Sequence, residues 1–181
     1  MRRLVARADT GHVLIDPGRP DLLDDLVSGQ RRPVVVIDGR SGSGKTTLAG
    51  DLAARHEGWQ LVHADDMYRG WSGLASVWNL SCLWSDHPGY DRWDWDSGRV
   101  DGRVDLDPTR PLVVEGCGVL TPANSHRATV RVWCEAPEPV RRRRALSRDP
   151  EFKDWWSMWA LQEGLHIARH RPADLADVTV G

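Results

Sequence analysis

Residues 39–46 constrain the fold of this chain more than any other segment. They read Gly-Arg-Ser-Gly-Ser-Gly-Lys-Thr, which matches the pattern G-x-x-x-x-G-K-[ST] at every fixed position. The β-branched run Val34–Ile37 precedes them, and a helical pattern runs from Lys45 to His56. A glycine-rich turn between a strand and a helix lets backbone N–H groups wrap phosphate oxygens at the positive end of the helix. The segment therefore predicts a phosphate-binding loop, or P-loop.

The motif also assigns roles to its side chains. Lys45 is expected to reach the β- and γ-phosphates of a nucleotide, and the Thr46 hydroxyl is expected to ligate Mg²⁺. Lys45 is one of only two lysines among 24 basic residues, so the required position holds a rare residue type. The predicted nucleotide-binding residues are Gly39, Arg40, Ser41, Gly42, Ser43, Gly44, Lys45, Thr46 and Thr47.

Apolar runs alternate with helical patterns through the rest of the chain, which is typical of βαβ units and a parallel sheet. We expect the three-layer α/β sandwich of P-loop NTPases, with a mostly parallel five-stranded sheet flanked by helices. The predicted strands are 34–37, 61–63, 112–114, 130–133 and 178–180. The predicted helices lie near 45–56, 73–85, 138–148 and 151–170, with a short one possible within 21–27 and a long loop over 86–110.

Composition excludes several classes of protein. The 181 residues carry a formal net charge of −2, from 24 basic and 26 acidic side chains, which gives no reason to expect nucleic-acid binding. No apolar run approaches the length of a membrane span, and the charged start lacks an apolar signal core. Three scattered cysteines favour reduced thiols over zinc or disulfides. We expect a cytoplasmic protein without a membrane partner, either a monomer or a homo-oligomer.

Acidic residues follow two of the predicted strands. Asp65 and Asp66 come after the second strand, where a carboxylate would face the γ-phosphate from the acceptor side and could take a proton. Helix capping is the competing interpretation of both. Glu115 ends the third strand beside the P-loop. Thr46, Asp65 and Glu115 therefore form the predicted Mg²⁺ site.

A run of arginines follows the fourth predicted strand. Read as a helix, Arg141, Arg144 and Arg148 fall at i, i+3 and i+7 and share one face. A row of guanidinium groups suits a lid over about 138–150 that stabilises charge on a transferring phosphoryl group. A solvated basic stripe and a nucleic-acid contact are the alternatives.

These elements together resemble the uridine kinase-like branch of P-loop kinases, which includes pantothenate, phosphoribulose and nicotinamide riboside kinases. The resemblance spans residues 33 to about 150. It is carried by Gly39–Thr47, Asp65–Tyr68, Pro88–Asp91, Val113–Gly116 and Val140–Asp149.

The resemblance implies ATP and Mg²⁺ as cofactors and a small-molecule acceptor. It makes Asp65 the carboxylate that activates the acceptor hydroxyl, with Lys45 and the three arginines as the other catalytic groups. It also implies a P-loop kinase-like domain over 33–181 after a lead-in over 1–32. Tyr68 and Tyr90 would shape the acceptor pocket, beside Asp66.

Trp95 stands where uridine kinases have a base-reading histidine, so the acceptor pocket departs from that pattern. Trp93 and Trp95 are candidate pocket residues, although the Trp-rich segment 71–95 can equally pack against the body. The acceptor would be nucleoside- or vitamin-like. Two other functions stay open: an acceptor-independent NTP hydrolase or nucleotide-sensing regulator, and a nucleic-acid-binding module that uses the arginines.

Overall fold

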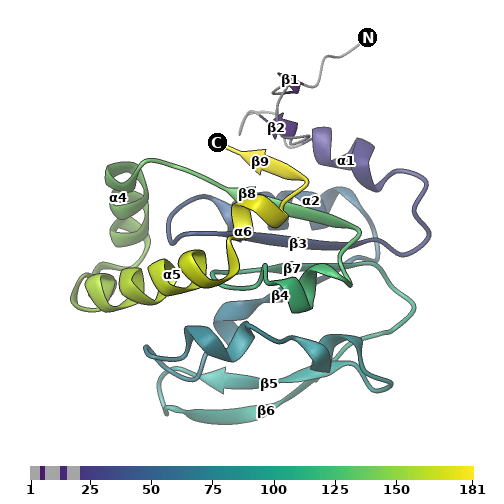
Figure 1. Cartoon of the computed structure of the whole chain (residues 1–181). Helices are drawn as coiled ribbons and strands as arrows, with labels where there is room; N and C mark the ends of the chain where they lie inside the picture. Colours follow the sequence, from purple (N-terminus) through teal and green to yellow (C-terminus); the bar gives the residue numbers. More distant parts are fainter. Residues whose placement is uncertain (1–4, 7–12, 16–20) are drawn as a thin grey trace.

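A computed structural model describes residues 5–6, 13–15 and 21–181 of the chain (Figure 1). The strands of the main sheet are β1 (Val5–Ala6), β2 (Val13–Ile15), β3 (Val34–Gly39), β4 (Gln60–His63), β7 (Leu112–Glu115), β8 (Val130–Cys134) and β9 (Val178–Val180). The α-helices are α1 (Leu22–Val27), α2 (Lys45–Arg55), α3 (Pro122–Ser125), α4 (Glu138–Arg148), α5 (Trp156–His170) and α6 (Pro172–Leu175). Four short 3₁₀ segments are η1 (Ala64–Asp66), η2 (Leu74–Val77), η3 (Ser81–Trp84) and η4 (Pro150–Asp154).

The main sheet has the order β1-β2-β9-β8-β3-β7-β4, and every neighbouring pair except β1 with β2 is parallel. The five predicted strands are adjacent in this order, which confirms the mostly parallel five-stranded sheet. β2 and β1 extend it at one side and were not predicted. In the register, Glu115 lies opposite both Ile37 and His63. The ends of β3, β4 and β7 therefore meet at one edge, where the P-loop begins.

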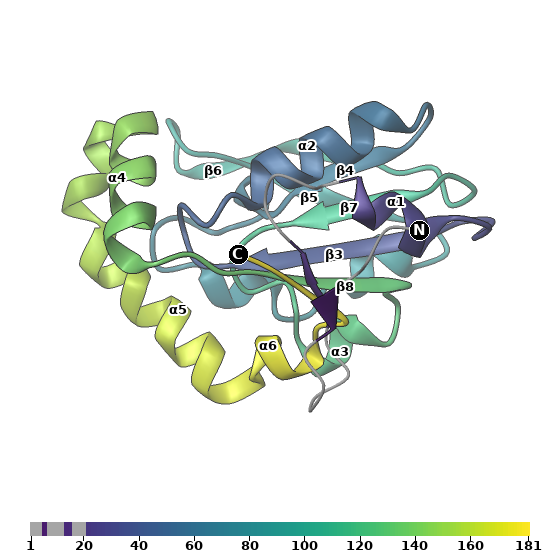
Figure 2. The ribbon, with the colours of Figure 1, turned by 90° about the horizontal axis from the view of Figure 1, so that it is seen from above.

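Two apolar layers cover the sheet because side chains alternate along its strands. Val35 and Ile37 face a cluster with α1 and α2, whereas Val36 faces a cluster that includes Trp156 and Trp159 of α5. Figure 2 shows α1 and α2 on one side of the sheet and α3, α5 and α6 on the other. The predicted three-layer sandwich is confirmed. Within the described part of the chain, no helix combines the length and hydropathy that a bilayer crossing requires.

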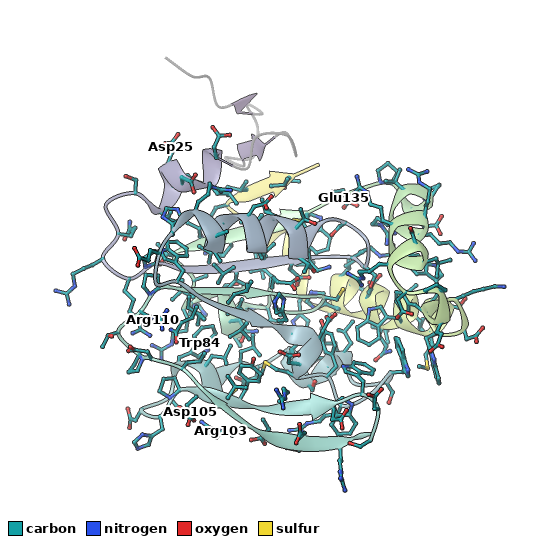
Figure 3. The ribbon with its side chains drawn as sticks, turned by 180° about the vertical axis from the view of Figure 1, so that it is seen from behind. Asp25, Trp84, Arg103, Asp105, Arg110 and Glu135 are labelled. Atoms are coloured by element: carbon teal, nitrogen blue, oxygen red, sulfur yellow. The ribbon has the colours of Figure 1, made fainter. Side chains whose placement is uncertain are left out.

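The prediction of a long loop over 86–110 is wrong. β5 (Gly89–Asp94) and β6 (Arg99–Asp105) pair antiparallel as a separate hairpin, with an irregularity between Asp91 and Trp93. β6 is almost wholly exposed and mostly polar, so it lacks the apolar run that marks a buried strand. Figure 3 shows Arg103 and Asp105 at the outer edge of this hairpin, where their side chains form an ion pair of 2.9 Å.

The helix predicted over 73–85 is replaced by η2 and η3. Three tryptophans lie in or just before this segment. Trp71, Trp78 and Trp84 all pack, partly buried, against the apolar core, and Trp71 also lies on a cavity described below. Packing is therefore part of the role of all three.

The helix predicted over 151–170 begins later than expected, because η4 precedes α5. Phe152, Trp156 and Trp159 are buried as the periodicity predicts. Trp155 is 40% exposed, however. It stands at the junction between the two helical segments, where the spacing of one continuous helix does not hold.

Candidate active site

The P-loop joins β3 to α2 in a conformation that only glycine adopts easily. Gly42 and Gly44 have φ values of 78° and 105°, in the left-handed region. A Cβ atom added at Gly42 would lie 2.1 Å from the backbone oxygen of Arg141, which belongs to α4. The close approach of α4 to the loop therefore requires glycine here. Gly39 is packed as tightly, since an added Cβ would lie 2.4 Å from the Cys134 oxygen.

Lys45 lies buried beneath the loop. Its Nζ donates to the Arg40 backbone oxygen at 3.2 Å and lies 3.5 Å from Cys117 Sγ. Burial alone would lower the pKa of Lys45, but Cys117 and the carboxylates of Glu115, Glu163 and Asp65 raise it above its ordinary value. Burial also raises the pKa of the Cys117 thiol to about 12. The ammonium is therefore fully charged.

A hydroxyl, a carboxylate and an imidazole follow one another at the edge of the sheet. Thr46 Oγ1 donates to Glu115 Oε1 at 3.2 Å, and His63 Nδ1 lies 2.7 Å from the same oxygen. The Glu115 side chain is only 3% exposed, so its hydrogen bond raises the pKa of His63. Among the residues described, no group of three or more His, Cys, Asp or Glu side chains forms a metal cluster.

The two aspartates of η1 point to different surroundings. Asp65 lies on the cavity and its surface is exposed there. The protein groups around it raise the pKa of its carboxyl by partial desolvation, and Glu115 raises it further against the opposing effect of Lys45. Asp66 instead accepts a hydrogen bond of 3.3 Å from the Tyr90 hydroxyl and does not line the cavity. The N-cap residue of η1 is His63, so Asp65 and Asp66 lie inside this segment and not at its cap position.

The predicted acceptor residues are likewise divided. Tyr68 and Trp95 line the cavity, and Trp95 Nε1 donates to the Asp65 backbone oxygen at 2.9 Å. The Tyr68 hydroxyl donates to the Cys117 oxygen at 2.8 Å. Tyr90 and Trp93 lie outside the cavity lining, and the Trp93 ring faces the Arg69 guanidinium at 5.7 Å.

The three arginines of α4 that the sequence places on one face have different surroundings. Arg144 and Arg148 are exposed and line the cavity. Arg141 is 2% exposed and donates to the backbone oxygens of Ser41 and Ala136 at 3.2 and 3.0 Å. It therefore connects α4 to the P-loop from behind, and it does not reach the cavity.

Most of the predicted site residues line one cavity of about 680 Å³. Of the predicted site residues, it is lined by Ser41, Gly42, Gly44, Lys45, Thr46, Thr47, Asp65, Tyr68, Trp95, Glu115, Arg144 and Arg148. Gly39, Arg40, Ser43, Asp66, Tyr90, Trp93 and Arg141 do not line it. Cys117, Trp71, Trp155 and Trp159 also line it, and the sequence did not suggest any of them as site residues.

Two buried carboxylates that support the loop were also missed. Glu163 of α5 accepts a 2.6 Å hydrogen bond from the Ser41 backbone and a 2.9 Å one from Arg40 Nε. Asp38 accepts backbone N–H groups of Gly39, Gly118 and Leu120, and its Oδ2 lies 2.9 Å from His166 Nε2. Asp38 directly precedes the motif, which was the only signal available in the sequence.

No family model matches the chain. Among curated proteins, it is 55% identical over 40 residues to a cytidylate kinase of Shewanella amazonensis and 52% identical over 40 residues to that of Shewanella oneidensis. Each match covers 22% of this chain and 17% of the cytidylate kinase, so the similarity is confined to a short segment.

Solved structures resemble the chain over most of its length. A possible uridine kinase from Bacillus stearothermophilus superimposes with a TM-score of 0.63 at 20% identity, covering 91% of this chain and 98% of the other. A putative fructose transport system kinase from Silicibacter sp. TM1040 gives 0.54 at 19% identity, covering 90% and 97%. The chain therefore shares the α/β fold of these two proteins.

Proposed function

We propose that the protein transfers the γ-phosphoryl group of ATP to a hydroxyl of a small molecule. One observation carries the proposal: a P-loop lysine, a carboxylate of raised pKa and two arginines converge on one cavity. The two similar structures, described as kinases, and the short cytidylate kinase matches support the reaction class.

Each group has a defined part in this reaction. Backbone N–H groups of the P-loop and the Lys45 ammonium would hold the phosphates. Arg144 and Arg148 would stabilise charge on the phosphoryl group during transfer. Asp65 would accept the proton of the acceptor hydroxyl, a task that a carboxyl with raised pKa performs well near neutral pH. Arg141 would act on the loop and not on the phosphates, because it is buried behind Ser41.

The residues present fit a Mg²⁺ ion. The Thr46 hydroxyl and the Glu115 carboxylate, 3.2 Å apart, supply hard oxygen ligands at the end of the P-loop, with Asp65 on the same cavity. Mg²⁺ in such sites takes one or two protein ligands and completes its shell with phosphates and water. When bound, it neutralises charge on the phosphates.

We further propose that residues 33–181 are the catalytic domain, with 138–150 as its lid, and that it works in the cytoplasm. The free thiols of Cys82, Cys117 and Cys134 suit that compartment. The net charge of −2 favours a small molecule over a nucleic acid as the partner.

The test is phosphoryl transfer from γ-labelled ATP with Mg²⁺ to a pool of nucleosides, vitamins, amino alcohols and sugars. We expect a labelled product that is lost in Lys45→Ala and reduced by about 10²- to 10⁴-fold in Asp65→Asn, while Asp65→Asn still binds ATP. Arg143→Ala is the matched control, because this exposed arginine of the same helix lies outside the cavity lining.

Other outcomes contradict the proposal. Release of inorganic phosphate that no acceptor stimulates would favour the NTP hydrolase, and ATP binding without any turnover would favour the regulator. Failure of the wild-type chain to bind ATP would exclude all three nucleotide-dependent functions.

A further inference from the structure

Three indole rings form a corner on the cavity, and we call Trp71, Trp95 and Trp155 the aromatic corner. Trp71 and Trp155 stack with their centroids 5.2 Å apart and their planes within 5° of parallel. Trp95 contacts Trp71 at 5.0 Å with an interplanar angle of 59°. Trp95 is therefore inclined to Trp155 by nearly the same angle. These two rings remain 38% and 40% exposed.

The aromatic corner is fixed in place by the surrounding structure. Gln162 Nε2 donates to the Trp71 backbone oxygen at 2.7 Å, and the Phe152 ring stacks on Trp71 at 5.4 Å. On the hairpin, Asp94 accepts hydrogen bonds from the Asp96 backbone at 3.0 Å and from Ser97 Oγ at 2.6 Å, which shapes the turn that carries Trp95. The exposed indole surface is thus preorganised, and a ligand that covers it gains apolar contact at little entropic cost.

Two carboxylates flank the aromatic corner. Asp96 follows Trp95 directly, and Glu151 lies four residues before Trp155; both line the cavity. Within the described ranges, neither carboxylate takes part in an ion pair. Asp149, also on the cavity, accepts hydrogen bonds from two backbone N–H groups of η4 and so caps that segment.

Acidic side chains outnumber basic ones on the cavity. Its basic side chains are Lys45, Arg144 and Arg148, and its acidic ones are Asp65, Asp96, Glu115, Asp149 and Glu151. The three basic groups are those that the proposed function assigns to the phosphates of ATP. An anionic acceptor would therefore meet carboxylates without free cationic partners, whereas a cation would meet both the carboxylates and the faces of indole rings.

We propose that the acceptor is an alcohol that carries an organic cation, and that the aromatic corner binds that cation beside Asp96 and Glu151. This inference rests on the proposed function. The acceptor oxygen forms a bond to the γ-phosphorus as the bond from that phosphorus to the bridging oxygen breaks. ADP leaves with the bonding electron pair, and the hydroxyl proton passes to Asp65. The charge on the cation is unchanged.

The test is calorimetric binding to the full chain saturated with Mg²⁺ and the non-hydrolysable analogue β,γ-imido-ATP. The probes are choline, its neutral isostere 3,3-dimethylbutan-1-ol and the anion 4-hydroxybutyrate. We expect choline to bind about tenfold more tightly than the neutral alcohol, and the anion to bind most weakly. Trp95→Leu, Trp155→Leu and Glu151→Gln should each weaken choline several-fold, whereas Trp155→Phe should retain most of the affinity.

Trp59→Leu and Glu57→Gln are the matched controls, since neither residue lines the cavity. Equal affinity for choline and its isostere, tighter binding of the anion, or no binding of choline below about 10 mM would overturn the inference. The nucleotide is titrated first in the same samples. Failure of that titration would contradict the proposed function, whereas failure of the choline titration alone would contradict only the cation site.

Discussion

Glu163 Oε1 accepts a hydrogen bond of 2.6 Å from the backbone nitrogen of Ser41, although 122 residues separate them. The same carboxylate pairs with Arg40 at 2.9 Å and is only 4% exposed. α5 thus holds the first half of the P-loop from outside the cavity, as Arg141 holds it from α4. The loop geometry depends on residues that need not touch a ligand.

Glu163→Ala should lower the free energy of unfolding by about 1–3 kcal/mol, because it leaves the Ser41 N–H buried without its acceptor. Nucleotide affinity should fall as well, since the loop loses this support. Urea unfolding and ATP titration measure the two effects. Glu57→Ala, at an exposed glutamate, is the control, and equal stability of the two variants would contradict the role of Glu163.

Gly42→Ala should abolish nucleotide binding. The added methyl would lie 2.1 Å from the Arg141 oxygen, and a φ of 78° strains any side chain. Gly50→Ala provides the comparison, because nothing lies within 4 Å of its added Cβ and alanine favours a helix by about 0.5–1 kcal/mol. ATP binding by Gly42→Ala at wild-type strength would mean that α4 moves away freely.

Arg141→Met should reduce thermal stability and weaken ATP binding by about tenfold, since two backbone oxygens lose their donor. Arg143→Met should leave both unchanged. A variant of Arg141 that keeps its ATP affinity but loses phosphoryl transfer would show instead that the guanidinium acts on the phosphates.

His63 should stabilise the metal-free protein more at low pH than at high pH. Its hydrogen bond to Glu115 raises the pKa of His63 in the folded state, so folding favours the protonated ring. The stabilisation is fully present below the ordinary histidine pKa of 6.5 and disappears as the pH rises through the raised value. Urea unfolding of the wild type and His63→Gln in EDTA, at several pH values, measures it. A difference that does not vary with pH would contradict the prediction.

Asp94→Ala should loosen the hairpin turn that carries Trp95. Asp94 accepts the Asp96 amide and the Ser97 hydroxyl, so its loss should accelerate hydrogen exchange over residues 94–98. ATP affinity should not change. Asp105→Ala, on the outer edge of β6, should leave exchange at the turn unaltered.

The parts of the fold and of the candidate site that could be predicted are those that a contiguous run of residues marks. The P-loop, Asp65, Glu115 and the five strands are each marked by a contiguous run or by the end of one. Glu163 and His166 have no such mark, because their roles arise only when α5 packs against the loop and against Asp38. The β5–β6 hairpin escaped prediction because it is exposed. The burial of Arg141 could not be predicted, because the spacing of a shared helix face does not distinguish a buried position from an exposed one.

α5 runs without interruption from Trp156 to His170. Glu163 and His166 on it hold the P-loop and Asp38, while Trp159 lines the cavity near the aromatic corner and Gln162 holds Trp71. A displacement of this helix that adjusts one end of the cavity must shift the other by the same rigid-body movement. Under the proposed function, binding of the nucleotide would then change the geometry of the acceptor site, and binding of the acceptor would change that of the P-loop. The position of this one helix would determine the order in which the two ligands bind.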